Sequence, residues 1–259
     1  AAAYANDALT FDPQKFTAQT VSVNGESIAY RAYEQIVYVK NPVDSKYQQM
    51  NIYIPEAYFT GQKFNGFTAQ TAPIFLPNSI GGYMPAEPAT AAPSAMGPNA
   101  GKTSTVAQAL AKGFVVAAPA ARGRTMTTGK APAAIVDLNA AVRYLRFHAK
   151  VLFGDANKII SNGTSAGGAM SALLGASGNS KDYAPYLKAL GAANARDDVF
   201  AVSAYCPIAN LEHADAAYEW QFNGVNDYKK MVFGNMIDFH MERKEVAGTI
   251  TADEIVRSN

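Results

Sequence analysis

A serine at position 165 and its neighbours are the residues of this sequence best suited to chemistry. Residues 163–167 read Gly-Thr-Ser-Ala-Gly, the G-x-S-x-G pattern of a nucleophile elbow, in which a serine stands on a sharp turn between a strand and a helix. Small neighbours are needed because this turn brings the backbone close to itself while the serine hydroxyl stays exposed. The pattern predicts that Ser165 is a catalytic nucleophile. The alternative is a glycine-rich turn whose serine caps an ordinary helix.

The segments on either side of the motif have the order that an elbow requires. Residues 158–162 predict a short strand, and Ala169, Leu173 and Leu174 indicate the helix that follows. The N-terminus of such a helix aims backbone N–H groups and a positive dipole end at developing negative charge. The N–H of Ala166 is therefore the expected first donor of an oxyanion hole.

The second oxyanion donor is expected on the loop after an earlier strand. Residues 77–83 (Pro-Asn-Ser-Ile-Gly-Gly-Tyr) follow the predicted strand at 74–76, which is the right place in chain order. The loop differs from the HGGG form of lipases and esterases. Gly82 is the preferred donor, Gly81 is the alternative, and a plain glycine turn without a catalytic role is the remaining interpretation.

The elements that must position these residues indicate an α/β fold. Residues 21–30 alternate around Asn24-Gly25 and predict a hairpin, and further strands are expected at 36–39 and 51–54. Apolar runs at 74–76 and 114–118 then alternate with helical patterns, which is typical of a parallel sheet with crossovers.

Three helical and strand segments complete the expected arrangement. One helix is capped by Thr103 or Ser104 and ends before Gly113. A second begins near Pro132, and its apolar stripe consists of Ile135, Leu138, Val142 and Leu145. Residues 199–205 are expected to form one more buried strand, and residues 212–254 have a polar, helix-like character.

Composition excludes several classes of function. The 259 residues carry a net charge of +1 without a dense basic run, so nucleic acid is not an expected partner. The apolar stretches are too short to span a membrane, and 49% hydrophobic residues with 17% charged ones indicate a globular chain. One cysteine and three histidines show no zinc-ligand spacing, so neither a metal nor another cofactor is expected. The small residues at 1–5 suggest export, hence a secreted or periplasmic protein.

A catalytic base for Ser165 is hard to find in the sequence. His148 precedes the serine, whereas His213 and His240 follow it without a recognisable late strand before either one. His213 and His240 are each a candidate base, and the preferred interpretation of both is helix surface or packing; His148 lies in a predicted helix. The catalytic acid and histidine are therefore expected outside these 259 residues, which correspond to the first half of an enzyme.

The chain resembles bacterial tannases, the gallate-ester hydrolases that have an α/β-hydrolase fold with a large inserted lid. The resemblance covers nearly the whole chain and depends on the stretches at residues 38–44, 72–85, 118–124, 130–138, 160–169 and 203–208. It implies the first approximately six strands of the hydrolase core over residues 1–208. Residues 209–259 would then begin the lid.

The same resemblance implies roles for individual residues. Ser165 would attack the galloyl carbonyl and form an acyl-enzyme, with Gly82 and Ala166 as oxyanion donors and Ile208 as a wall of the substrate pocket. A C-terminal chain of the same precursor would supply the acid and the histidine. Arg122 and Arg124, on the loop after residues 114–118, are expected to form structural ion pairs more than substrate contacts.

Two other functions are compatible with the sequence. One is a feruloyl esterase, or an esterase for another small aromatic acid, which would use the same serine on a different ester. The other is a non-catalytic, hydrolase-like binding chain. The intact elbow disfavours this last interpretation, because a chain without catalysis has no need of a strained serine.

Overall fold

The computed structural model describes residues 9–95, 100–208, 227–237, 240–249 and 251. The chain divides into two compact units, Ala1–Ile208 and Ala209–Asn259. The boundary lies at the same residue as the one expected from the sequence. That the second unit begins a lid stays a prediction, as does export, because residues 1–8 lie outside the described ranges.

The first unit is built on a seven-stranded mixed sheet. Its strands are β1 (Thr17–Val23), β2 (Glu26–Val37), β3 (Gln49–Pro55), β4 (Pro73–Pro77), β5 (Val115–Pro119), β6 (Asp155–Thr164) and β7 (Ala201–Tyr205). Their spatial order is β1-β2-β3-β5-β4-β6-β7. The pairs up to β3–β5 are antiparallel, and β5, β4, β6 and β7 run parallel. The hairpin and the later parallel strands are as predicted.

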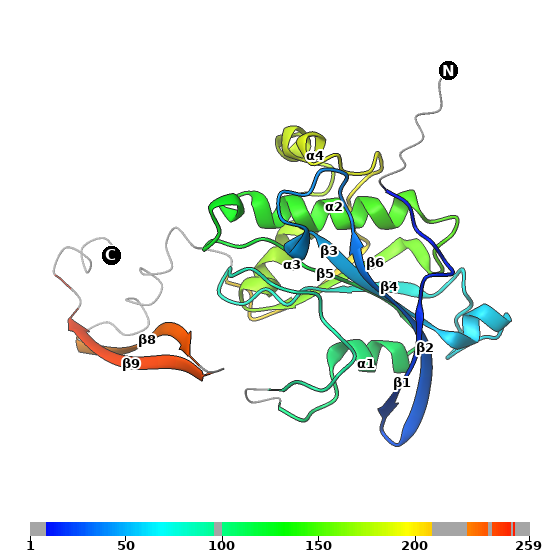
Figure 1. Ribbon diagram of the computed structural model, residues 1–259, viewed down its shortest axis with the longest axis horizontal. Coiled ribbons are helices and arrows are strands. Elements are labelled where there is room, and N and C mark those ends of the chain that lie inside the picture. Colours follow the sequence, from blue (N-terminus) through cyan, green and yellow to red (C-terminus); the bar gives the residue numbers. More distant parts are fainter. Residues whose placement is uncertain (1–8, 96–99, 209–226, 238–239, 250, 252–259) are drawn as a thin grey trace. The chain divides into compact units, whose positions relative to one another are not determined.

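Helices cover both faces of this sheet (Figure 1). They are α1 (Thr105–Ala111), α2 (Ala133–Phe147), α3 (Ala166–Ala176) and α4 (Ala184–Ala189). The hydroxyl of Ser104 accepts a hydrogen bond from Ala107 N at 3.0 Å and caps α1, as predicted. On α2 the predicted apolar stripe is buried throughout and belongs to the same core cluster as Ile74 and Leu76 of β4.

The core is divided into two layers by the alternation of side chains along the buried strands. Ile74 and Leu76 of β4 belong to the layer that contains α2 and α3, whereas Phe75 between them belongs to the layer that contains α1. These strands are apolar on both faces, because a parallel sheet covered by helices has no face in water. The packed core therefore fixes the carboxyl ends of β4, β6 and β7 relative to one another.

The strand β7 differs from its expected burial. It pairs with β6 on one side and with no other strand of the described residues, so it forms an edge of the sheet. Phe200 is 66% exposed, Val202 40% and Tyr205 60%. The expectation of a buried strand is wrong because the apolar side chains of an edge strand have neighbours on one side only.

The second unit contains a two-stranded antiparallel ribbon, β8 (Asp227–Ile237) and β9 (His240–Thr249). The helical character expected for these residues is wrong. The polar residues suggestive of a helix surface instead fit a ribbon, as in the exposed ion pair of Lys229 with Glu245 at 2.9 Å across the two strands.

Candidate active site

The predicted site residues gather at the carboxyl ends of the parallel strands. Pro77 at the end of β4 pairs with Asn162 of β6, and Thr164 at the end of β6 pairs with Tyr205 at the end of β7. The loops that follow these strands therefore start side by side. In open α/β sheets, ligands bind in the crevice outside such strand ends.

Ser165 has the backbone conformation of a nucleophile elbow. It stands between β6 and α3 with φ +59° and ψ −122°, a strained combination for a residue with a side chain. Its N–H donates to Tyr205 O at 2.9 Å, and its carbonyl oxygen accepts from Ala169 N at 3.0 Å. The serine side chain caps no N–H of the helix. The alternative of an ordinary capping serine is therefore wrong, and the half-buried hydroxyl stays available.

The glycines of the motif are required by contacts of the backbone with itself. A Cβ on Gly163 would lie 2.2 Å from Gly167 O, and a Cβ on Gly167 would lie 2.8 Å from Ile80 O. On Gly168 it would lie 2.7 Å from Tyr205 O. Each of these distances is too short for real atoms. Helix α3 can therefore approach β6, β7 and the loop after β4 only because these positions lack side chains.

Asn78, a buried residue at the start of the loop after β4, joins that loop to the elbow. Its side-chain Nδ2 donates to Asn162 O and Gly167 O, both at 3.1 Å, and to Ser171 Oγ at 2.9 Å. Its Oδ1 accepts from Ile80 N at 3.2 Å. Asn78 received no role from the sequence. The available signal was a lone amide side chain directly after a buried strand.

Gly82 lies in a tight turn on the same loop. Met84 N donates to Gly81 O at 3.0 Å, and the two central residues, Gly82 and Tyr83, have φ of +56° and +58°. Within the described part of the chain, the N–H groups of Gly82 and Ala166 donate no hydrogen bond. That they bind an oxyanion stays a prediction.

Ile208 and Tyr83 connect this turn to the serine. The Tyr83 hydroxyl donates to Ile208 O at 2.6 Å, and Ile208 N approaches Ser165 O at 3.4 Å. The Ile208 side chain is 43% exposed beside the elbow, where it could contact an apolar group. Burial raises the pKa of Tyr83, so its hydroxyl stays protonated and remains a donor. The role of Ile208 as a wall of the substrate pocket stays a prediction.

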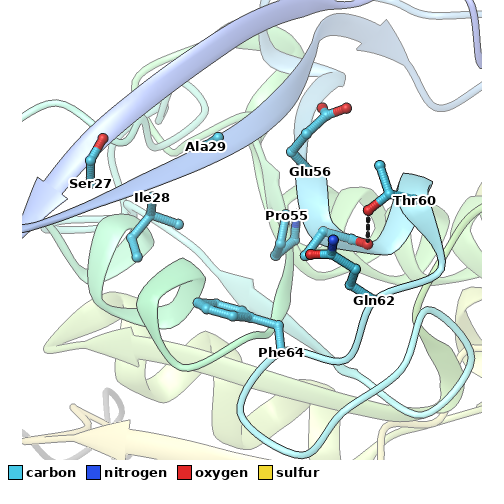
Figure 2. Close-up of a pocket in the computed structure, with 9 residues that line it drawn as sticks. Ser27, Ile28, Ala29, Pro55, Glu56, Thr60, Gln62 and Phe64 are labelled. Atoms are coloured by element: carbon cyan, nitrogen blue, oxygen red, sulfur yellow. Dashed lines mark hydrogen bonds between the residues drawn. The ribbon is translucent and has the colours of Figure 1, made fainter.

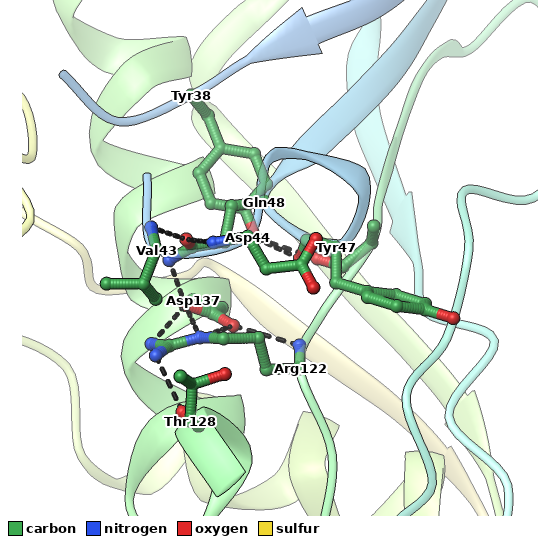
Figure 3. A network of polar contacts seen from close by, with 9 residues as sticks. Tyr38, Val43, Asp44, Tyr47, Gln48, Arg122, Thr128 and Asp137 are labelled. Carbon is green, nitrogen blue, oxygen red and sulfur yellow. Dashed lines mark hydrogen bonds and ion pairs between the residues drawn. The ribbon is translucent and has the colours of Figure 1, made fainter. Parts of the chain in front are cut away.

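A buried polar network holds the loop after β5 (Figure 3). Nε of Arg122 donates to Asp137 Oδ2 at 2.9 Å and Nη2 donates to Oδ1 at 2.8 Å, while Gln48 Nε2 reaches Oδ1 at 2.9 Å. Nη1 of Arg122 donates to Thr128 O at 2.8 Å. The expected ion pair of Arg122 is thus confirmed. Such a bidentate pair fixes geometry, because leaving either buried charge alone is costly.

No histidine among the described side chains is placed to assist Ser165. His148 is buried at the end of α2 with its ring against Tyr144 at 4.4 Å and Phe147 at 5.0 Å. Burial lowers its pKa, so it is a neutral packing residue. His240 lies in β9 without a described side chain, and His213 lies outside the described residues.

A surface hollow of about 320 Å³ lies elsewhere on the molecule (Figure 2). Ile28, Pro55, Glu56 and Phe64 line it, together with Ser27, Ala29, Ala57, Thr60 and Gln62. Pro55 ends β3, which runs antiparallel to β5, so the hollow is near the amino end of β5 and opposite the elbow. It contains none of the predicted site residues.

The described residues give no sign of a metal centre or a membrane span. No group of three or more His, Cys, Asp or Glu side chains gathers among them as metal ligands would. No described helix is both long and apolar enough to cross a bilayer.

The sheet with helices on both faces and the strained serine between β6 and α3 define an α/β-hydrolase fold with a nucleophile elbow. The BD-FAE family model matches residues 94–254, which include the elbow. The chain belongs to this α/β-hydrolase family. A search of curated proteins gave no match.

Solved structures confirm the resemblance to tannases. The chain is 56% identical to a Fusobacterium nucleatum tannase, with a TM-score of 0.87 over 96% of this chain and 54% of the other. A Lactobacillus plantarum tannase is 47% identical, with a TM-score of 0.87 over 96% and 55%. A tannin acyl hydrolase in complex with ethyl gallate is 46% identical, with a TM-score of 0.83 over 98% and 54%. The chain thus spans about half the length of these structures.

Proposed function

We propose that this chain is the nucleophile-bearing part of a carboxylic ester hydrolase of tannase type, acting on galloyl esters through an acyl-enzyme on Ser165. The observation that carries the proposal is the strained Ser165, whose side chain caps no N–H of the helix, together with the N–H groups of Gly82 and Ala166 that donate no hydrogen bond within the described residues. The tannase structures at 46–56% identity, one of them bound to ethyl gallate, support the choice of ester.

The proposed reaction has two steps with the same geometry. The Ser165 oxygen attacks the ester carbonyl carbon, and a base takes the serine proton and passes it to the departing alcohol. The oxyanion formed in each step accepts hydrogen bonds from Gly82 N and Ala166 N, each worth about 10²–10³-fold in rate. Water then attacks the acyl carbon, the base takes the water proton and passes it to the serine oxygen, and the bond from that oxygen to the acyl carbon breaks to release the acid. Ile208 would contact the aromatic ring of the acyl group.

We propose that a C-terminal chain of the same precursor supplies the base and the acid. Two observations support this completion: the chain spans about half of the solved tannases, and the edge strand β7 leaves Phe200, Val202 and Tyr205 exposed. Long, apolar sheet edges are normally covered or paired in native proteins. The partner would add a strand beside β7 and cover these side chains.

The test uses a complemented protein, in which residues 1–259 are joined to the part of the Fusobacterium nucleatum tannase that this chain does not cover. We expect this protein to hydrolyse ethyl gallate, and Ser165→Ala to reduce the rate by at least about 10⁴-fold. Ser177→Ala, at the other end of α3, is the matched control and should leave the rate unchanged. Full activity of the Ser165→Ala variant contradicts the assignment of the nucleophile.

A panel of esters separates the proposed substrate from its alternatives. Faster hydrolysis of ethyl gallate than of methyl ferulate supports the galloyl preference, and the reverse order would assign the site to another aromatic acid. A complemented protein that hydrolyses none of the esters and does not react with a fluorophosphonate at Ser165 would be a non-catalytic, hydrolase-like chain.

A further inference from the structure

The turn that carries Gly82 is held in a strained form. Residues 81–84 are closed by the hydrogen bond from Met84 N to Gly81 O, and both central residues have positive φ, as in a type I′ turn. Glycine adopts this conformation freely, whereas a tyrosine rarely does. The surrounding contacts must therefore keep Tyr83 at φ +58°.

Arg124 supplies those contacts. Its Nε donates to Gly82 O at 2.7 Å, and its backbone N–H donates to Tyr83 O at 2.8 Å. Two successive carbonyl oxygens of the turn are thus held by one residue. Arg124 forms no ion pair with a carboxylate of the described residues, so the ion pair expected from the sequence is not observed there.

The backbone of Arg124 is fixed independently of its side chain. A Cβ on the preceding Gly123 would lie 2.1 Å from Pro85 N, so these two segments touch main chain to main chain. Lys130 Nζ donates to Arg124 O at 2.6 Å, and the adjacent Arg122 is anchored to Asp137. A substitution that removes only the guanidinium should therefore leave the loop in place.

The guanidinium decides which way the peptide between Gly82 and Tyr83 faces. In a trans peptide the carbonyl oxygen and the following N–H point in opposite directions, so holding Gly82 O also orients Tyr83 N–H. If this central peptide turned over, the turn would become type II′, in which only the first central residue keeps a positive φ. The strain on Tyr83 would be relieved, and the turn that carries the Gly82 N–H would lose its present form.

We propose that Arg124 is a positioning residue that holds the strained turn carrying the Gly82 N–H, the proposed oxyanion donor. The turn adjoins the serine through the bonds of Tyr83 to Ile208 and of Ile208 to Ser165. Without Arg124 the turn would hold the Gly82 N–H less firmly, and the proposed oxyanion would lose part of the stabilisation that its two N–H donors supply. This inference rests on the proposed function, because it assigns a role in the same oxyanion site.

The first test is steady-state hydrolysis of ethyl gallate by the complemented protein with Arg124→Met, which keeps side-chain length but removes the donor. We expect kcat to fall about tenfold or more and KM to change less than about twofold, as for a loss confined to the transition state. Arg196→Met removes an exposed guanidinium bound to Asp198 and Asn157, and should leave both constants unchanged.

A second background shows whether Arg124 acts through the turn. With Tyr83→Gly the type I′ turn is no longer strained, so Arg124→Met should lower kcat less than it does in the parent. An equal loss of kcat in both backgrounds would overturn the proposal. So would an Arg124→Met variant with an unchanged kcat. A variant in which only KM rises would overturn it as well, because that result indicates direct substrate contact. A crystal structure of the Arg124→Met variant should show Tyr83 at negative φ; an unaltered turn would equally overturn it.

The two proposals fail in different ways. If Ser165→Ala is inactive while Arg124→Met keeps the kcat of the parent, Ser165 remains the nucleophile and only the positioning role of Arg124 is wrong. If Ser165→Ala keeps full activity, the proposed function itself is wrong, and the role of Arg124 is wrong with it.

Discussion

Alanine in place of Gly163 puts a methyl group inside the turn that presents the nucleophile. Its Cβ would lie 2.2 Å from Gly167 O and 2.8 Å from Asn78 Nδ2, and real Cβ atoms essentially never come within 3.0 Å of such neighbours. The gap to Gly167 O must therefore open by about 0.8 Å, which moves the first turn of α3 against β6. Ala166 N belongs to that turn, so the oxyanion donor moves relative to Ser165.

Gly163→Ala is expected to lower kcat strongly and the free energy of unfolding only modestly. Misplacing a catalytic group by about 1 Å costs about 10²-fold in rate, and overpacking a tight site costs about 1–3 kcal/mol of folding free energy. We therefore expect Gly163→Ala to lower kcat on ethyl gallate by about a hundredfold in the complemented protein, with a modest fall in the urea midpoint.

Gly61→Ala is the matched control for this experiment. Gly61 has φ +72° and no atom within 4 Å of an added Cβ, so alanine there adds backbone strain without a clash at the elbow. It should lower the urea midpoint while leaving kcat unchanged. If the kcat of Gly163→Ala stayed within twofold of the parent value and its urea midpoint were unchanged, the close contact of β6 with α3 would be refuted.

Three further predictions concern the scaffold around the site. Asp137→Ala leaves the Arg122 guanidinium buried without its partner, and urea unfolding should show a loss of about 3–5 kcal/mol, whereas Glu87→Gln at an exposed pair should show no change. Because burial lowers the pKa of His148 below the usual 6.5, the unfolded chain binds a proton that the folded chain does not, so stability is lost as the pH falls from about 7 to 5. His148→Phe should make this loss smaller, and equal pH dependence in both proteins would contradict the buried, neutral ring. Asn78→Ala removes the side-chain bonds between the loop after β4 and α3, so kcat should fall about tenfold or more, and a fall in stability without a fall in kcat would leave Asn78 a purely structural residue.

Local sequence patterns were enough to predict the elbow and the helices α1, α2 and α3. The glycines around Ser165 indicate a close backbone approach, and that approach is seen between Gly163 and Gly167. Ser104 and the apolar stripe of α2 were likewise readable, because capping and helical periodicity depend on residues a few positions apart. The choice of Ala166 as a proposed oxyanion donor follows from the same local order of strand, turn and helix, whereas the choice of Gly82 follows from the place of its loop after an earlier strand.

The contacts that link distant segments could not be read from the sequence. Asn78 meets Gly167 and Arg124 meets Gly82 only because the sheet order places β4 beside both β5 and β6. The exposure of β7 depends on its place at the edge of the sheet, which an apolar run does not reveal. Residues 227–249 have a pattern compatible with helix or strand, and the pairing of β8 with β9 decides between them.

The most direct test of the central claim is to look for the acyl-enzyme itself. The complemented protein is mixed with ethyl gallate, quenched rapidly in acid, digested and analysed by peptide mass spectrometry. The account predicts a galloyl group on the peptide that contains Ser165, and no such adduct in the Ser165→Ala variant. Turnover of ethyl gallate with the galloyl group on another residue, or undiminished turnover by Ser165→Ala, would contradict it.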